Sequence, residues 1–303
     1  MSSSPMTSQE TMYVRRLGEY YGATAYALYP SQSMLEGLPG ADLQFYVNNL
    51  AEWLAKGILL SQSLSRILIS AGPLLLPEIR SGIGRKGSKY SLPARILDDL
   101  MICRTRAFFT SHRRKYVSRR IADMEDSEKR GESFIKSYLF SRLKSPETEE
   151  FNHILRADVK KKYYIVYGDP GMELICEPDA ALVIKIYSRI LRAIRAIVVE
   201  VSDTDSNIIL ARRHVIPRIL LYMAATYLHY GVASAGLYVS LSPKSDPPAV
   251  LFIQKRTGGR ELTKMLDRVI ELLEASQPPA PRGEPPCNHC VYAGICIFRR
   301  DHI

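Results

Sequence analysis

Three cysteines close together near the end of the chain are the residues best suited to chemistry. Cys287, Cys290 and Cys296 follow the pattern Cys-x2-Cys-x5-Cys directly after Pro285 and Pro286. Two thiols three residues apart on a tight turn converge on one point, and a third a few residues later closes a three-thiolate face. Because three thiolates rarely make a closed site, a fourth ligand is expected from a remote part of the chain. Tetrathiolate geometry suits zinc or an iron–sulfur cluster.

The uneven spacing of these cysteines favours a cluster over a zinc ribbon. A ribbon needs two Cys-x2-Cys pairs, and this chain has one. The only other cysteines are Cys103 and Cys176. A zinc site and three unrelated thiols are the alternatives. Five cysteines, three of them clustered, are typical of a reducing compartment rather than of a disulfide scaffold.

The composition predicts a folded protein with an anionic partner. The chain has 303 residues, of which 46% are hydrophobic, enough for the core of one or two domains. Its formal net charge is +10, and its basic residues cluster. The clusters are Arg104, Arg106, Arg113, Arg114, Lys115, Arg119 and Arg120, then Lys160–Lys162, then Arg212 and Arg213. This density predicts nucleic acid as the partner, ahead of an anionic membrane surface, since an amphipathic anchor helix is not evident.

Two segments bear on localisation. Residues 1–10 are polar and lack the apolar stretch of a signal peptide. The segment from Ile219 to Leu241 carries no Lys, Arg, Asp or Glu, but His229, Tyr230 and Gly231 interrupt it. We interpret it as a buried helix followed by a strand rather than as a membrane span. The sequence therefore predicts a cytoplasmic protein without a membrane partner.

The first half of the chain is predicted to be helical. Apolar residues recur at helical spacing between residues 11 and about 80, and a Gly-, Lys- and Ser-rich linker follows over Ser81–Ser91. The periodic residues are Leu43, Val47, Leu50, Leu54 and Ile58, then Leu64, Ile67 and Leu68. Two further helices are expected over Leu92–Ser118, which carries Cys103, and over Asp126–Arg142.

The pattern changes to strands from Tyr163 onward. Expected strands are Tyr163–Tyr167, Glu173–Ile186 with a break at Pro178, Ile197–Val201, Gly236–Leu241 and Ala249–Gln254. Helices are expected over Arg212–Tyr230 and Arg260–Ala275, and a Pro-rich linker, Gln277–Pro286, precedes the cysteine tail. Strands mixed with helices predict an α/β fold.

The order of these features resembles that of the RecB-like nucleases with an iron–sulfur cluster. The resemblance is closest to the CRISPR-associated Cas-four exonuclease family and its Csa-one relatives, and it covers about residues 92–303. It implies a helical N-terminal region (1–90) and a RecB-like PD-(D/E)xK nuclease core with a small mixed sheet flanked by helices (91–276). A Pro-rich linker and cluster-binding tail (277–303) would complete the chain.

The resemblance also implies how the cysteines are used. Cys103 would be the remote fourth ligand of a [4Fe–4S] cluster, together with Cys287, Cys290 and Cys296. The cluster would staple the C-terminal tail to the start of the nuclease fold. Cys176 lies in a predicted strand and is expected to be a buried free thiol.

Asp179 and Glu200 take the family's metal-binding positions. Because a hard cation such as Mg²⁺ or Mn²⁺ is held by carboxylate oxygens, the resemblance implies a divalent-metal site for phosphodiester hydrolysis. The two residues are 21 positions apart, enough for a hairpin-like return that brings both to one end of a sheet. Strand alternation would place Glu200 and Ser202 on one face and Val201 on the other.

Several positions depart from the family pattern. The segment 131–136, where the family has a metal-binding His, contains none. Ser202 replaces the motif Lys, and losing such a charge stabiliser typically costs on the order of 10²–10³ in rate. Lys185 and Arg218 are candidates for a replacement cation; Arg218 stands where the family has Gln, and Tyr222 keeps the family's Tyr.

The expected function is therefore metal-dependent DNA exonuclease activity on single-stranded or duplex ends during CRISPR spacer acquisition, in antiviral defence with other adaptation proteins. The alternative is a catalytically degenerate DNA-binding or complex-forming subunit, and a zinc protein of unrelated function is the third possibility. Convergence of Asp179, Glu200, Lys185 and Arg218 in a basic groove would favour an enzyme, and dispersal would favour the binding subunit.

Overall fold

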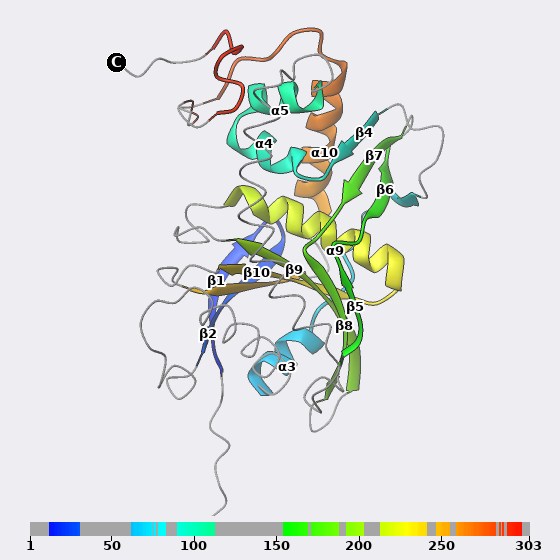
Figure 1. The fold of residues 1–303 in the computed structure, drawn as a ribbon. Coiled ribbons are helices and arrows are strands. Elements are labelled where there is room, and N and C mark those ends of the chain that lie inside the picture. Colours follow the sequence, from blue (N-terminus) through cyan, green and yellow to red (C-terminus); the bar gives the residue numbers. More distant parts are fainter. Residues whose placement is uncertain are drawn as a thin grey trace, which may run out of the picture.

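The computed structural model combines two mixed β-sheets with helices, so the chain has an α/β fold (Figure 1). The residues it describes are 12–30, 62–74, 76, 78–82, 90–112, 154–168, 171–187, 192–202, 213–240, 247–254, 259–282, 285, 287 and 290–298.

The larger sheet contains seven strands in the order β1-β2-β11-β10-β9-β8-β5. Its strands are β1 (Met12–Tyr20), β2 (Ala23–Pro30), β5 (Ile154–Val159), β8 (Ala180–Tyr187), β9 (Arg192–Ser202), β10 (Ser234–Ser240) and β11 (Ala249–Gln254). Only β9 and β10 pair in parallel among these neighbours. Parallel strands need a crossover connection, and helix α9 (Ile216–Tyr230) supplies it.

The smaller sheet contains four strands in the order β3-β6-β7-β4. They are β3 (Ile79–Gly82), β4 (Tyr90–Pro93), β6 (Tyr163–Tyr167) and β7 (Met172–Cys176). The chain then leaves this sheet at Pro178 and enters the larger one as β8. Asp179 therefore lies at the junction between the two sheets.

Helices cover both faces of the larger sheet (Figure 1). Helix α9 lies across one face, and α3 (Gln62–Ile69) lies against the other. Close approach of α9 is possible because Gly236 faces it from β10; a Cβ there would lie 2.3 Å from Cγ2 of Ile219. Left-handed Gly231, with φ of +69°, ends the helix.

A further helical layer stands beyond α9. It comprises α4 (Ile96–Ile102), α5 (Arg104–Ser111) and α10 (Gly259–Glu274). Strand alternation divides the apolar residues of the larger sheet into two cores. Val198 belongs to the core under α9, which continues to α4, α5, α10 and the smaller sheet. Val199 and Val201 belong to the core under α3.

The prediction of helix from residue 11 onward is wrong for β1 and β2. These segments form a hairpin through Tyr21 and Gly22, whose φ angles of 51° and 78° suit the tight turn between two strands. The hairpin adds to β11, so the main sheet is larger than the predicted small sheet. Leu64 and Leu68 do lie on a helix, α3, as predicted.

Two other boundaries differ from the prediction. The expected linker Ser81–Ser91 has strand at both ends, because Ser81 belongs to β3 and Ser91 to β4. The expected single helix carrying Cys103 is two helices, α4 and α5, separated at that residue. The predicted helical positions Leu43–Ile58 and Asp126–Arg142 lie outside the described residues.

The predicted elements from Tyr163 onward are confirmed, including the break at Pro178. The segment that raised the question of a membrane span forms α9 and β10. No helix in the described ranges combines the length and the apolar character needed to cross a membrane.

Candidate functional site

The four cysteines expected to act together line one cavity. Cys103, Cys287, Cys290 and Cys296 all border a hollow of about 440 Å³, its solvent-open mouth included, between α5 and the C-terminal tail. Cys176 lies elsewhere, fully buried on β7, and burial raises the pKa of its thiol. The structure therefore separates the fifth cysteine from the other four.

A break between two helices places Cys103 at the cavity. Its backbone is extended, with φ of −161° and ψ of 122°, while its N–H donates to the Asp99 carbonyl at 2.8 Å and closes α4. Its own carbonyl accepts from the Ala107 N–H at 3.0 Å and starts α5. The residue thus forms the elbow between α4 and α5.

The tail is anchored to α5 by side chains that are not cysteines. Tyr292 is buried, its ring stacks on Phe109 with centroids 5.4 Å apart, and its hydroxyl lies 3.3 Å from Thr110 Oγ1. Thr105 Oγ1 donates to the Pro279 carbonyl at 2.6 Å. A tight turn, in which the Cys290 N–H donates to the Cys287 carbonyl at 3.1 Å, presents the tail cysteines.

The cavity is mostly apolar but has one cationic wall. Burial raises the pKa of Cys290, and the neighbouring Cys103 and Cys296 add to this effect. A backbone hydrogen bond at Tyr292 and the charge of Arg106 oppose it. Asp99 holds Arg106 in place with an Nε–Oδ1 distance of 2.5 Å. Four thiols that border one cavity supply the donor type that an iron–sulfur cluster uses.

Asp179 and Glu200 meet at one end of the β8–β9 pair. Ala180 lies opposite Val199, so continuing the register by one residue places Asp179 opposite Glu200. Both carboxylates are buried, each 6% exposed. Asp179 Oδ2 accepts the backbone N–H of Val201 at 2.8 Å, which fixes its position. Glu200 and Ser202 share the α9 face of β9 with Val198, as strand alternation predicted.

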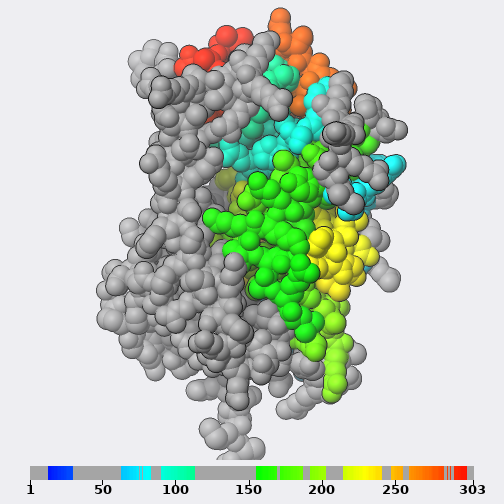
Figure 2. Space-filling model, turned by 45° about the vertical axis from the view of Figure 1, so that its right-hand side comes forward, coloured from blue at the N-terminus to red at the C-terminus, as the bar shows by residue number. Residues whose placement is uncertain are grey.

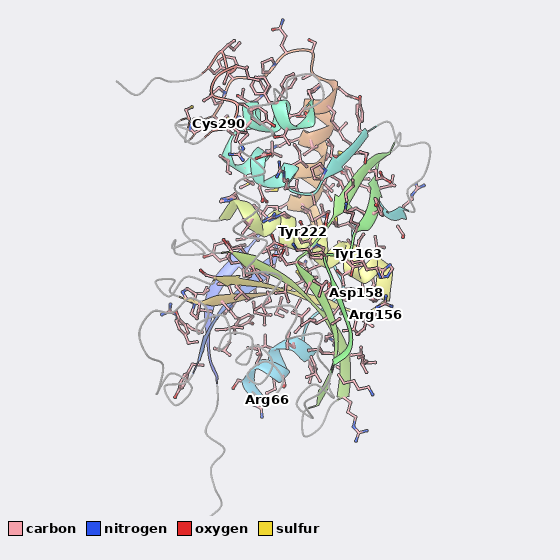
Figure 3. The ribbon with its side chains drawn as sticks, in the orientation of Figure 1. Arg66, Arg156, Asp158, Tyr163, Tyr222 and Cys290 are labelled. Carbon is pink, nitrogen blue, oxygen red and sulfur yellow. The ribbon has the colours of Figure 1, made fainter. Side chains whose placement is uncertain are left out.

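Arg218 joins this carboxylate pair from the first turn of α9. Its Nη2 lies 3.0 Å from Glu200 Oε1, and its Nε lies 3.1 Å from Asp98 Oδ2. Burial lowers the pKa of Arg218, but the two carboxylates outweigh burial and hold it well above its usual value. The guanidinium carbon lies 5.9 Å from the ring centre of Tyr222, one turn further along α9. Figure 3 shows the position of Tyr222 on this helix.

Asp98 also belongs to this site, although it was not predicted from the sequence. It lies in the first turn of α4, where the helix dipole favours acidic residues. Its Oδ1 is buried and has no hydrogen-bond partner in the described part of the chain, whereas Asp99 is taken by Arg106 and Thr110. An adjacent pair of acidic residues within an apolar helix, five residues before Cys103, was the available signal. We call Asp98, Asp179, Glu200 and Arg218 the carboxylate site.

Lys185 is not part of the carboxylate site. It is exposed on β8 opposite Ile194, six residues from Glu200 along β9. At about 3.3 Å per residue this is roughly 20 Å, beyond the reach of a lysine side chain. The prediction that Lys185 replaces the motif Lys is therefore wrong, and Arg218 is the cation that the fold brings to the carboxylates. The segment 131–136 lies outside the described residues.

Replacing Asp98 by Asn is expected to alter how stability depends on pH. Burial raises the pKa of Asp98 to about 7, although Arg218 opposes the rise. Since this exceeds the unfolded value of about 3.9, the proton stabilises the folded state at low pH, and this stabilisation is lost as the pH rises toward 7. Between pH 5 and pH 7 the free energy of unfolding of the wild type should fall by about 2–3 kcal/mol relative to that of Asp98→Asn. Above pH 8 the difference between the two proteins should stay constant.

Urea unfolding at each pH measures this difference. Glu274→Gln, an exposed change on α10, is the matched control and should run parallel to the wild type. If the free energies of unfolding of Asp98→Asn and the wild type ran parallel between pH 5 and pH 8, Asp98 would be ionised over that whole range and the prediction would be wrong.

The comparisons with known proteins give a distant structural likeness. No family model matches the chain, and no curated protein matches it. Among solved structures, that of SSO0001, a Sulfolobus protein, matches with 17% sequence identity and a TM-score of 0.44. The match covers 73% of this chain and 91% of that one.

Within the described residues, no three His, Cys, Asp or Glu side chains are arranged closely enough to hold a single metal ion.

Proposed function

We propose that the protein is a RecB-like iron–sulfur DNA nuclease that processes DNA ends during CRISPR spacer acquisition. The observation that carries this proposal is the convergence of Asp179 and Glu200, buried beside Arg218. The same chain brings four cysteines to one cavity, the second feature that the resemblance implied. DNA ends, the other adaptation proteins and the cytoplasm are the corresponding partners and location.

The carboxylate site offers oxygen ligands for Mg²⁺ or Mn²⁺. Asp179 and Glu200 would hold the ion. Asp98, whose buried Oδ1 has no hydrogen-bond partner within the described residues, is bridged to Glu200 by Arg218 and does not come close enough to complete a three-ligand site. When bound, such an ion polarises a phosphate oxygen and lowers the pKa of a water molecule. Three carboxyl groups face one guanidinium, so the site attracts a cation even when Asp98 carries a proton.

Arg218 is the residue that would stabilise the reacting phosphate. It is permanently charged, and its planar fork of N–H donors matches phosphate oxygens. Its ion pair with Glu200 keeps it next to the carboxylates, where the family's Lys would act. Because Ser202 brings no charge to this face, we expect the rate to be low.

The cysteine cavity would stabilise the same site through α4. Cys103 follows the last turn of α4, and Asp98 lies in its first turn. A cluster held by Cys103 and the tail cysteines would fix that end of α4 and thereby help to position Asp98 against Arg218. Its role in this proposal is structural.

Cleavage of linear DNA tests the proposed function. Anaerobically purified protein is incubated with end-labelled single-stranded and duplex DNA in Mn²⁺, in Mg²⁺ and in EDTA. We expect slow degradation from the ends in either metal and none in EDTA. Wild-type protein that degrades DNA no faster in Mn²⁺ than in EDTA would contradict the proposal.

A second candidate function is a non-catalytic DNA-binding or complex-forming subunit. The double ion pair of Arg218 with Asp98 and Glu200 favours it, because the guanidinium then balances buried carboxylates without a metal. In that case Arg218→Ala should destabilise the fold by about 3–5 kcal/mol, since it leaves buried charges unpaired, and added Mn²⁺ should not restore stability. If the protein is a nuclease with a metal at this site, Mn²⁺ should restore part of the stability that Arg218→Ala loses.

A further inference from the structure

A second hollow lies directly behind the cysteine cavity. It measures about 900 Å³, its open mouth included, and lies between the α4–α5 elbow, α10 and the segment that follows α10. Ile102 and Cys103 border both this hollow and the cysteine cavity. We call it the arginine cleft, because Arg104, Arg268 and Arg282 line it.

The three arginines come from segments far apart in the sequence. Arg104 is the first residue of α5, Arg268 lies on the exposed side of α10, and Arg282 lies on the segment leading to the tail. Helix α10 turns its apolar stripe, which includes Leu266 and Val269, toward the core, so Arg268 projects outward. Figure 2 shows α10 and the tail together at one end of the molecule, where the layer of α4 and α5 also lies in Figure 1.

The described lining of the arginine cleft carries a net positive charge. None of its three arginines forms an ion pair or a hydrogen bond with another described residue, in contrast to Arg106 and Arg218. Glu271 is the acidic residue among the described lining, so three arginines against one glutamate leave a net charge of +2. Unpaired guanidinium groups in a concave surface concentrate positive potential and attract phosphate groups.

We propose that the arginine cleft binds the phosphate backbone of DNA beside the cysteine cavity. The inference deepens the proposed function, because it takes DNA as the substrate. Apolar side chains, Leu100 and Met101 among them, line the cleft together with the arginines and would contact sugars and bases. Since α4 carries both Asp98 and part of the cleft lining, one helix links the bound strand to the carboxylate site.

The salt dependence of DNA binding tests this proposal. Affinity for a short fluorescein-labelled single strand is measured in EDTA between about 50 and 200 mM salt. The test uses the double variant Arg268→Ala/Arg282→Ala, which leaves Arg104 in place because that residue is next to Cys103. Loss of two phosphate contacts should flatten the slope of log K against log salt by about 1.4 and weaken binding about tenfold at the lower salt. Glu271→Gln should tighten binding.

Arg260→Ala is the matched control, because Arg260 is exposed on the same helix but outside the cleft. It should bind as the wild type does. Unchanged slope and affinity in the double variant would overturn the proposal, as would tighter competition by a polyglutamate peptide than by DNA, which would assign the cleft to an acidic protein.

Failure of this inference is distinguishable from failure of the proposed nuclease. If the double variant flattens the salt slope but the wild type shows no metal-dependent cleavage, the arginine cleft binds DNA and the nuclease proposal is wrong. If the wild type cleaves DNA but the double variant keeps the full salt slope, the nuclease proposal stands and the arginine cleft does not bind DNA.

Discussion

Asp179→Ala and Glu200→Ala are each expected to slow Mn²⁺-dependent DNA cleavage by on the order of 10²–10³-fold. Both carboxylates are buried at the same end of the β8–β9 pair, so under the proposed function losing either one removes one of the two residues assigned to the metal. Single-turnover cleavage of end-labelled DNA by the anaerobic protein measures the effect. Variants that cut as fast as the wild type would place the activity elsewhere or in a contaminant.

Three further variants define which residue supplies the positive charge. Lys185→Ala should leave the rate unchanged, because Lys185 is exposed roughly 20 Å along the sheet from Glu200. Arg218→Ala should lower the rate on the order of 10²-fold. Ser202→Lys should raise it if the site geometry is intact and only the charge has been lost. No gain would mean that Arg218 has remodelled the pocket.

Cys103→Ser is expected to abolish cluster binding and to destabilise the protein strongly. Residues 103 and 287 are 184 positions apart, so the cluster would close a very long loop, which by chain entropy alone contributes about 5 kcal/mol. Thermal unfolding, together with iron and sulfide content, measures both effects. If Cys103→Ser keeps the melting temperature and the iron content of the wild type, Cys103 is not a ligand of the cluster.

Cys176 provides the control for this experiment. It is fully buried on β7, away from the cavity, so its replacement should leave iron and sulfide content unchanged. Cys176→Ser places a hydroxyl in an apolar environment at a cost of about 1–3 kcal/mol. Cys176→Ala avoids this cost and is the better match for stability.

The sequence predicted those features that depend on local pattern. The break at Pro178 and the alternation around Glu200 follow from residues within a few positions of each other, and the structure contains both. The return from Asp179 to Glu200 is an antiparallel pairing of consecutive strands, the easiest long-range contact to anticipate. The cysteine spacing predicted the grouping of Cys287, Cys290 and Cys296, the resemblance added Cys103, and all four border one cavity.

Features that depend on tertiary contacts were not predictable in this way. The β1–β2 hairpin lies in the main sheet because β2 pairs with β11, more than two hundred residues later. Asp98 belongs to the carboxylate site only because α4 packs against α9. Lys185 was a candidate for the replacement cation because it is a lysine on the same predicted strand as Asp179. Only the strand register shows how far it lies from Glu200.

Because buried carboxylates beside an arginine also occur where no metal binds, the nuclease proposal requires, besides the convergence of Asp179 and Glu200, the iron–sulfur cluster that the cysteines would hold. The most direct measurement is therefore the iron, zinc and acid-labile sulfide content of the anaerobically purified wild-type chain. We predict a brown protein with about four iron and four sulfide per chain when the site is full. Stoichiometric zinc without sulfide would contradict the account.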